Sequence, residues 1–125
     1  MHPFRTAVEA GDIEAAVELL ADEPRFNSPV TFKPFEGRTT VETVLRAAFE
    51  VLDDFRYTDE LTTPDDGTHA IFFRARVGDR DVQGVDLIRT DADGRIEDFT
   101  VMVRPMSGVI ALAEAMGPKV GHLAK

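Results

Sequence analysis

The chain has no cysteine, no tryptophan and no long apolar run among its 125 residues. Without cysteine, disulfide bonds, thiol nucleophiles, Cys-ligated zinc and iron–sulfur clusters are excluded. The longest apolar run, 109–113, is far shorter than the roughly 20 residues that a membrane helix needs. The first residues also lack the apolar segment of a secretory signal, so we expect a cytoplasmic protein that does not enter a membrane.

Basic residues are in the minority. The chain has 14 Lys and Arg against 23 Asp and Glu, which gives a formal net charge of −9. A field of that sign repels phosphate backbones, so nucleic acid is not an expected partner. The three histidines, His2, His69 and His122, do not have metal-ligand spacing, and no Gly-rich phosphate loop occurs. We therefore expect neither a bound metal nor a cofactor.

Helical signals dominate the first third of the chain. Residues 4–10 predict a short helix that ends at Gly11, and Asp12 is a suitable N-cap for the next helix. That second helix has apolar residues at helical spacing and is expected to end at Pro24. Residues 26–35 contain two prolines and predict extended chain with at most a short edge strand.

Two longer helices are also predicted. In the first, Thr39 and Glu42 would form a capping box, in which each side chain bonds the backbone N–H of the other. The second is expected to begin near Ser107 and to end at Gly117 and Pro118. The apolar face of the first follows at helical spacing: Val41, Val44, Leu45, Ala48 and Leu52.

After residue 54 the apolar period changes from 3.6 to 2, which predicts strands. Turn signals such as Gly78-Asp79 separate them, and hairpin turns indicate antiparallel pairing. Helices segregated from such strands indicate one α+β domain, residues 1–125. The predicted strands are 55–61, 69–77, 80–90 and 96–104.

The order and spacing of three stretches resemble those of the nuclear-transport-factor-2-like superfamily. They are residues 11–16 (GDIEAA), residues 35–41 (FEGRTTV), and residues 84–88 leading to the turn at 93–96. The superfamily includes ketosteroid isomerases, limonene-epoxide hydrolases and SnoaL-like polyketide cyclases, and the resemblance covers nearly the whole chain. It implies a cystatin-like roll, a curved and cone-shaped antiparallel sheet with N-terminal helices that close a ligand pocket. Such a fold does not fix the function.

Asp86 is the first candidate for catalysis, because it lies among apolar residues on its predicted strand. Desolvation there would raise its pKa, as acid–base chemistry at neutral pH requires. The resemblance implies the same role, since the epoxide hydrolases and cyclases use an acidic residue at a similar position. Alternatively, Asp86 pairs with Arg74 or Arg76, or faces water. The residues that share its strand face are Val82, Gly84 and Ile88.

Compared with those enzymes, the site lacks several groups. Gly84 stands where the epoxide hydrolases have an arginine, and Val101 stands at the position of their second acid. Ser28 precedes a proline where the ketosteroid isomerases have their general-base aspartate. Tyr57, the only tyrosine, lies on a strand rather than on the expected helix. Neither named activity is therefore expected, while proton transfer by a single acid remains open.

Apolar strand faces predict a pocket lining that suits a small hydrophobic or aromatic ligand. The alternative is that these residues are core. Tyr57 is expected on one face with Phe55 and Leu61, where its hydroxyl either donates to a ligand or is satisfied at the edge of the core. The predicted ligand-binding residues are Tyr57, Ile71, Phe73, Val82, Gly84, Ile88, Phe99, Val101 and Val103.

Three functions remain open from the sequence. The first is an enzyme of the cyclase or isomerase kind that uses Asp86 as general acid or base on a small hydrophobic substrate. The second is a non-catalytic binder of a small apolar molecule. The third is an interaction domain that forms a homodimer through its outer sheet face, because an exposed apolar patch there needs a cover. That face would carry Val85, Leu87, Thr100 and Met102.

Overall fold

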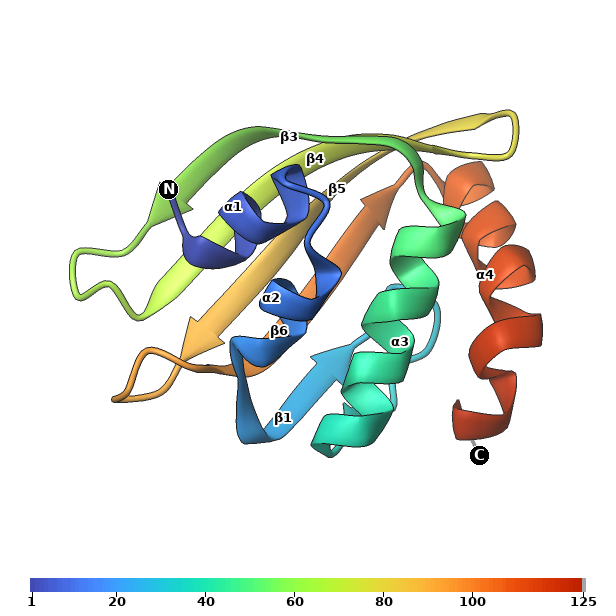
Figure 1. Ribbon diagram of the computed structural model, residues 1–125. Coiled ribbons are helices and arrows are strands. Elements are labelled where there is room, and N and C mark those ends of the chain that lie inside the picture. The colour runs from blue at the N-terminus through green and yellow to red at the C-terminus, as the bar shows by residue number, and fades with distance from the viewer. Residues whose placement is uncertain (125) are drawn as a thin grey trace.

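A six-stranded sheet that curls without closing forms the framework of the α+β fold, and the helices pack against one side of it (Figure 1). The structure is a computed structural model and describes residues 1–124. The strand order is β2-β1-β6-β5-β4-β3, so β2 and β3 are the edges. The strands are β1 Leu20–Asn27, β2 Phe35–Glu36, β3 Asp53–Thr62, β4 Thr68–Val77, β5 Arg80–Thr90 and β6 Ile96–Arg104. The helices are α1 Pro3–Glu9, α2 Ile13–Glu18, α3 Arg38–Val51 and α4 Met106–Val120, followed by the 3₁₀ turn η1 Gly121–Ala124.

The two short N-terminal helices begin close to the predicted positions, and each has a side-chain cap. The Oδ1 atom of Asp12 accepts the N–H of Ala15 at 3.0 Å at the start of α2. Between the helices, Gly11 has φ 72°, a conformation that favours glycine. At the start of α1, Nδ1 of His2 accepts the N–H of Phe4 at 3.0 Å, and the ring of Phe4 is fully buried.

The prediction that the second helix runs to Pro24 is wrong. The helix ends at Glu18, and the chain turns directly into β1, whose Leu20 pairs with Ile96 of β6 in parallel. Pro24 lies where the β1–β6 register shifts, between Leu20 and Arg25, so its missing N–H removes no regular ladder bond. Long-range pairing with β6 therefore overrides the local helical period.

The capping box predicted for α3 is also absent. The N-cap is Gly37 with φ 92°, which places Thr39 inside the first turn, where its side chain cannot cap the helix. Glu42 instead accepts from the guanidinium of Arg38 at 3.3 Å. The predicted apolar face is retained, and Val41, Val44 and Leu45 are buried.

Strands β4, β5 and β6 match the predicted hairpins closely. Strands β4 and β5 pair in unbroken antiparallel register, which places Asp86 opposite Ile71 on β4, and β6 places Val101 on the other side of Asp86. Gly78 has φ 60° at the hairpin turn between β4 and β5.

Helix α4 differs from the prediction at both ends. Pro105 takes the N-cap position rather than Ser107, and the helix continues through Pro118 to Val120. The apolar residues Leu112, Met116 and Val120 repeat every four positions, so packing of this stripe carries the helix across the proline.

A bulge in β3 changes the face of its second half. Tyr57 pairs with Phe73, whereas Asp59 pairs with Phe72, so one extra residue lies between them. Leu61 is consequently 64% exposed instead of sharing the inner face with Tyr57. The predicted grouping of Leu61 with Tyr57 is therefore wrong.

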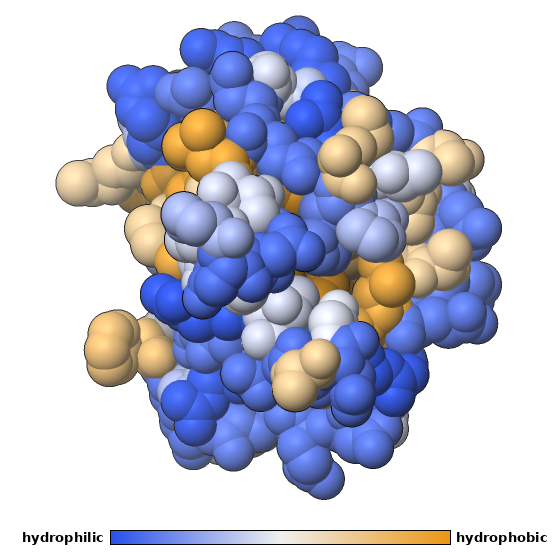
Figure 2. Space-filling model, turned by 90° about the vertical axis from the view of Figure 1, so that its left-hand side faces the viewer, coloured by the Kyte–Doolittle hydropathy of each residue, from blue (hydrophilic) through white to orange (hydrophobic). Residues whose placement is uncertain are grey.

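The side of the molecule that carries the N-terminus is mostly hydrophilic, with hydrophobic residues in separate small groups (Figure 2). This distribution agrees with the formal net charge of −9. No helix within residues 1–124 has the length and apolar character needed to span a membrane.

Candidate functional site

A cavity of about 140 Å³ lies between the inner face of the sheet and the helices α3 and α4. The segment 28–31, which follows β1, closes part of its wall. The lining is almost entirely apolar, and Asp86 is its only ionisable residue in the part of the chain that the structure describes. Six phenylalanines contribute to it, namely Phe26, Phe35, Phe49, Phe55, Phe73 and Phe99.

Asp86 reaches this cavity from the middle of β5 and is only 5% exposed. Burial raises the pKa of its carboxyl group from 3.8 to about 7. A hydrogen bond from the Tyr57 hydroxyl, 2.9 Å from Oδ2, acts in the opposite direction but is the smaller effect on the pKa. The carboxyl group is therefore poised to exchange a proton near neutral pH.

The second oxygen of this carboxyl group, Oδ1, accepts no hydrogen bond from residues 1–124. Thr31 Oγ1 is the one unpaired side-chain oxygen or nitrogen in this range that is sealed from solvent. Because Oδ1 of Asp86 is unpaired but not sealed, it is open to the cavity. One oxygen is thus held by the protein, while the other faces the space that a ligand would occupy.

Ion pairing of Asp86 with Arg74 or Arg76, the alternative left open by the sequence, does not occur. Both arginines lie on the outer face of β4, because they alternate with the buried Phe73 and Ala75. The guanidinium of Arg76 instead lies 3.8 Å from the carboxylate of Asp81. Among residues 1–124, no cation pairs with Asp86, and its carboxyl group is desolvated with Tyr57 as its hydrogen-bond partner.

Tyr57 fixes the orientation of Asp86 rather than lining the cavity. Its side chain is 7% exposed, and its ring packs edge-on against Phe55 at 4.9 Å between centroids. Burial, and then the charge of Asp86, raise the pKa of Tyr57 well above 10, so the hydroxyl keeps its proton and donates. The guanidinium of Arg5 on α1 lies 5.9 Å from the ring centroid on the other side of this network.

The predicted ligand-binding residues separate into two groups. Phe73, Phe99, Val101 and Val103 line the cavity together with Asp86. The others are buried around it as core and do not line it: Tyr57, Ile71, Val82, Gly84 and Ile88.

A steric constraint explains why residue 84 is a glycine. A Cβ atom at this position would lie 2.4 Å from the ring of Phe73 and 2.7 Å from the carbonyl oxygen of Met102. Only glycine therefore lets the ring of Phe73 lie this close to the backbone of β5. The ring occupies the space that a larger residue at 84 would need.

The helical part of the lining was missed by sequence reasoning. Helices α3 and α4 contribute one wall of the cavity, and the segment after β1 contributes Ser28 and Thr31. The available signal was the apolar stripe on each helix, which looks the same whether it faces a filled core or a cavity. The helical lining residues are Val44, Leu45, Ala48, Phe49, Leu112, Ala113, Met116, Gly117 and Val120.

The described residues contain no cluster of three or more metal-ligating side chains. The rings of His2 and His69, which lie far apart in the sequence, contact each other in a tilted arrangement with 4.4 Å between ring centroids. His69 also bonds the hydroxyl of Thr62 at 3.0 Å, and the N–H of His2 donates to Glu60 at 2.8 Å. This pair therefore fastens α1 to the β3–β4 hairpin.

Comparison with known proteins identifies the family. The family model of the SnoaL-like domain matches residues 2–99. The chain belongs to this family, within the nuclear-transport-factor-2-like superfamily, as the sequence resemblance predicted. Among curated proteins no relative matches the chain.

Solved structures of several other proteins share the fold. A steroid delta-isomerase from Pseudomonas aeruginosa is 40% identical, with TM-score 0.87 over 96% of this chain and 88% of that chain. A protein with a cystatin-like fold from Silicibacter pomeroyi is 36% identical, with TM-score 0.86 over 94% of this chain and 85% of that chain. The epoxide hydrolase/cyclase-like enzyme SalBIII is 19% identical, with TM-score 0.66 over 84% and 87%, and shares the fold alone.

Proposed function

We propose that this SnoaL-like protein is a proton-transfer enzyme of the isomerase or cyclase kind, with Asp86 as its general acid and base. The observation that carries this proposal is the free Oδ1 of Asp86, open to an apolar cavity on a carboxyl group whose pKa is about 7. A group with a pKa near the working pH both takes and returns a proton efficiently. The relative from Pseudomonas aeruginosa, which is named an isomerase, supports the same class of reaction.

The geometry suggests how one carboxyl group serves both steps. The Tyr57 hydroxyl stays bonded to Oδ2 and fixes the plane of the carboxylate. Oδ1 takes a proton from a carbon next to a substrate carbonyl, so that the C–H bond breaks and an O–H bond forms. Return of that proton to a different carbon of the same molecule regenerates the carboxylate. The net reaction is an isomerisation that consumes nothing.

Replacement of Asp86 by Asn tests the proposal, because the amide keeps the shape of the side chain but cannot take a proton. A practical screen uses β,γ-unsaturated cyclic ketones, whose isomerisation to the conjugated enone is followed by ultraviolet absorbance. We expect turnover by the wild type and a loss of at least about 100-fold in Asp86→Asn. Turnover that survives this substitution would contradict the role of Asp86.

Replacement of Tyr57 by Phe is a second and more specific test. It removes the hydrogen bond that lowers the pKa of Asp86, so the midpoint of the rise of kcat/KM with pH should move to higher pH. A carbon-detected NMR titration of the Asp86 carboxyl measures the same pKa directly. A wild-type value near the ordinary 3.8 would contradict the proposal.

One observation favours a second function, a non-catalytic binder of a small apolar molecule. Asp86 is the only ionisable residue of the described lining, and the neighbouring position on β6, which resembles that of the second acid in the epoxide hydrolases, holds Val101. A reaction that needs separate acid and base groups has no second group here. Ligand binding that is equal in the wild type and Asp86→Asn, with no turnover of any ketone in the screen, would support the binder.

A further inference from the structure

We propose that the substrate is an uncharged carbonyl compound about the size of one ring, and that Met116 sets the upper size limit. This inference rests on the proposed function, because it names the substrate class of the same site. The carbonyl group follows from the chemistry, since a carboxylate with a pKa near 7 removes a proton only from an activated carbon. The cavity volume gives the size of the substrate, and the charge of the lining residues gives its neutrality. The position of Met116 identifies the residue that limits the size.

The size follows from the cavity volume of about 140 Å³. A cavity of about 150 Å³ lined by Leu, Ile and Phe in another protein binds benzene, so a volume of this order holds one six-membered ring. A four-ring steroid skeleton has roughly three times as many ring carbons and exceeds this volume. The expected substrate is therefore smaller than the one that the name of the Pseudomonas aeruginosa relative implies.

The charge follows from the lining. No lysine, arginine or histidine is among the described residues that border the cavity, so an anionic substrate would be buried without a counter-ion. An ammonium group would have one partner, Asp86, and that carboxyl already shares Oδ2 with Tyr57. One partner does not offset the cost of removing an ammonium from water. The site therefore selects a neutral molecule.

Met116 is the lining residue best placed to limit the size. It is half-buried on α4, and the Gly117 beside it is exposed, so its long side chain lies where the cavity meets the surface. Leu112, one turn earlier, is 6% exposed and belongs to the core. Truncation of Met116 therefore enlarges the cavity at its rim and removes a half-buried side chain rather than a fully buried one.

The test measures affinity separately from turnover, by NMR titration of the full chain with neutral ketones of increasing size. The probes are 2-cyclohexen-1-one, a two-ring fused enone and a four-ring steroid enone, with cyclohexanecarboxylate and cyclohexylammonium as charged analogues. We expect the wild type to bind the one-ring ketone at least about tenfold more tightly than every other probe. In Met116→Ala the two-ring enone should gain at least about tenfold in affinity.

Met106→Ala is the matched control, because Met106 is on the same helix, is 77% exposed and does not line the cavity. It should leave all affinities unchanged. Equal gains in Met106→Ala and Met116→Ala would overturn the assignment of Met116. Preference of the wild type for the steroid enone, the carboxylate or the ammonium would overturn the substrate class.

The two proposals fail in different ways. If the one-ring ketone binds the wild type and Asp86→Asn alike, and its β,γ-unsaturated isomer is never converted, the proposed reaction fails and the size and charge inference stands. If the steroid ketone binds tightly and is isomerised while one-ring ketones are ignored, the reaction stands and this inference fails. Absence of binding by the one-ring ketone overturns this inference as well.

Discussion

At the scale of single residues, Asp86 makes the folded protein less stable at neutral pH. Its pKa rises from 3.8 to about 7 on folding, so between these pH values the folded state holds a proton that the unfolded chain has released. Stability therefore falls as the pH rises through this window and reaches a constant penalty above it. A shift of this size corresponds to a penalty of about 4 kcal/mol.

Asp86→Asn should remove this penalty, since Asn stays neutral and its amide oxygen can still accept from Tyr57. We expect the variant to be more stable than the wild type at pH 8 by a few kcal/mol, up to the penalty of about 4 kcal/mol, with much less difference near pH 4. Urea unfolding at several pH values measures it. A difference between the two proteins that does not change with pH would show that Asp86 titrates normally.

At the scale of elements, α1 is held in place by side chains from the β3–β4 hairpin. Glu60 accepts the N–H of His2 at 2.8 Å and lies 3.4 Å from the guanidinium of Arg5. The bulge in β3 places Glu60 opposite Ile71 on the inner side, where it can reach α1. Arg5 in turn lies over the ring of Tyr57, so α1 covers the network that ends at Asp86.

The anchoring of α1 should be sensitive to acid. Burial, and then the neighbouring His69, lower the pKa of His2, while Glu60 and Asp66 act in the opposite direction. Below its ordinary pKa of 6.5 the unfolded chain gains a proton that the folded state resists, so acidification destabilises the fold.

His2→Asn keeps an oxygen that can cap α1 but does not titrate. Between pH 7 and pH 5 its melting temperature should fall by less than that of the wild type, with a difference of a few degrees. Thermal unfolding followed by circular dichroism checks this. Equal falls in both proteins would mean that His2 does not contribute to the acid sensitivity.

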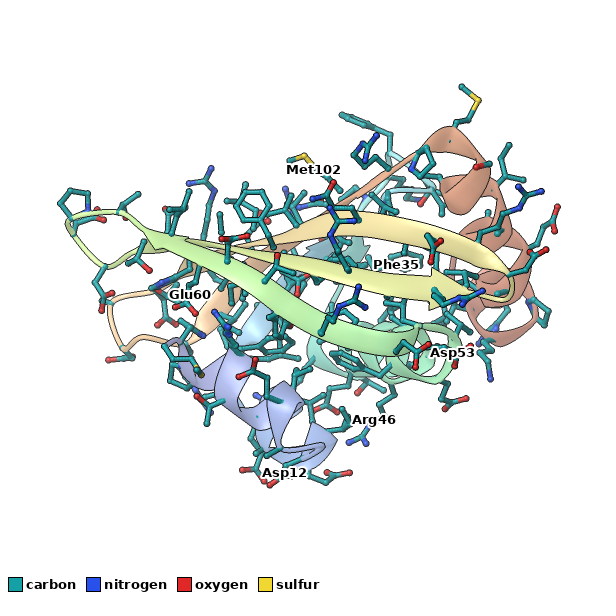
Figure 3. The ribbon with its side chains drawn as sticks, turned by 90° about the horizontal axis from the view of Figure 1, so that it is seen from above. Asp12, Phe35, Arg46, Asp53, Glu60 and Met102 are labelled. Atoms are coloured by element: carbon teal, nitrogen blue, oxygen red, sulfur yellow. The ribbon has the colours of Figure 1, made fainter. Side chains whose placement is uncertain are left out.

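At the scale of the whole molecule, no helix within residues 1–124 covers the outer face of the sheet. Figure 3 shows Met102 on the opposite side of the sheet from Asp12 of α2 and Arg46 of α3. Met102 is 52% exposed, and Val85, Leu87 and Thr100 beside it are half-buried. An apolar group on an open sheet face is typical of an interface.

We propose that this face forms a homodimer, with the sheet of one copy against that of a second. The wild type should elute as a dimer at micromolar concentration in size-exclusion chromatography with light scattering. Met102→Glu should elute as a monomer, because dimer formation would then bury an unpaired carboxylate. Met106→Glu, on α4, is the matched control and should remain dimeric. A monomeric wild type would contradict the proposal.

The resemblance of the sequence to known proteins indicated the family. The sequence by itself also determined the α+β class, the β4–β5–β6 hairpins and the position of Asp86 among apolar neighbours. These features depend on local period, turn residues and strand alternation, which neighbouring residues specify without reference to distant ones. The parallel pairing of β1 with β6, the bulge in β3 and the continuation of α4 through Pro118 were decided only by the tertiary structure. In each of them, contacts between distant residues outweigh the local signal.

Two features of the site were also decided only by the tertiary structure. They are the hydrogen bond from Tyr57 to Asp86 and the division of the cavity lining between the sheet and the helices. Tyr57 and Asp86 are separated along the chain by the whole of β4, and only the pairing of β3 with β4 and of β4 with β5 brings them together. An apolar stripe on a helix reports burial but not whether the buried space is filled or empty. The sequence could thus name Asp86 and part of the cavity lining, whereas the helical wall of the cavity and the hydrogen bond that orients Asp86 could not be predicted from it.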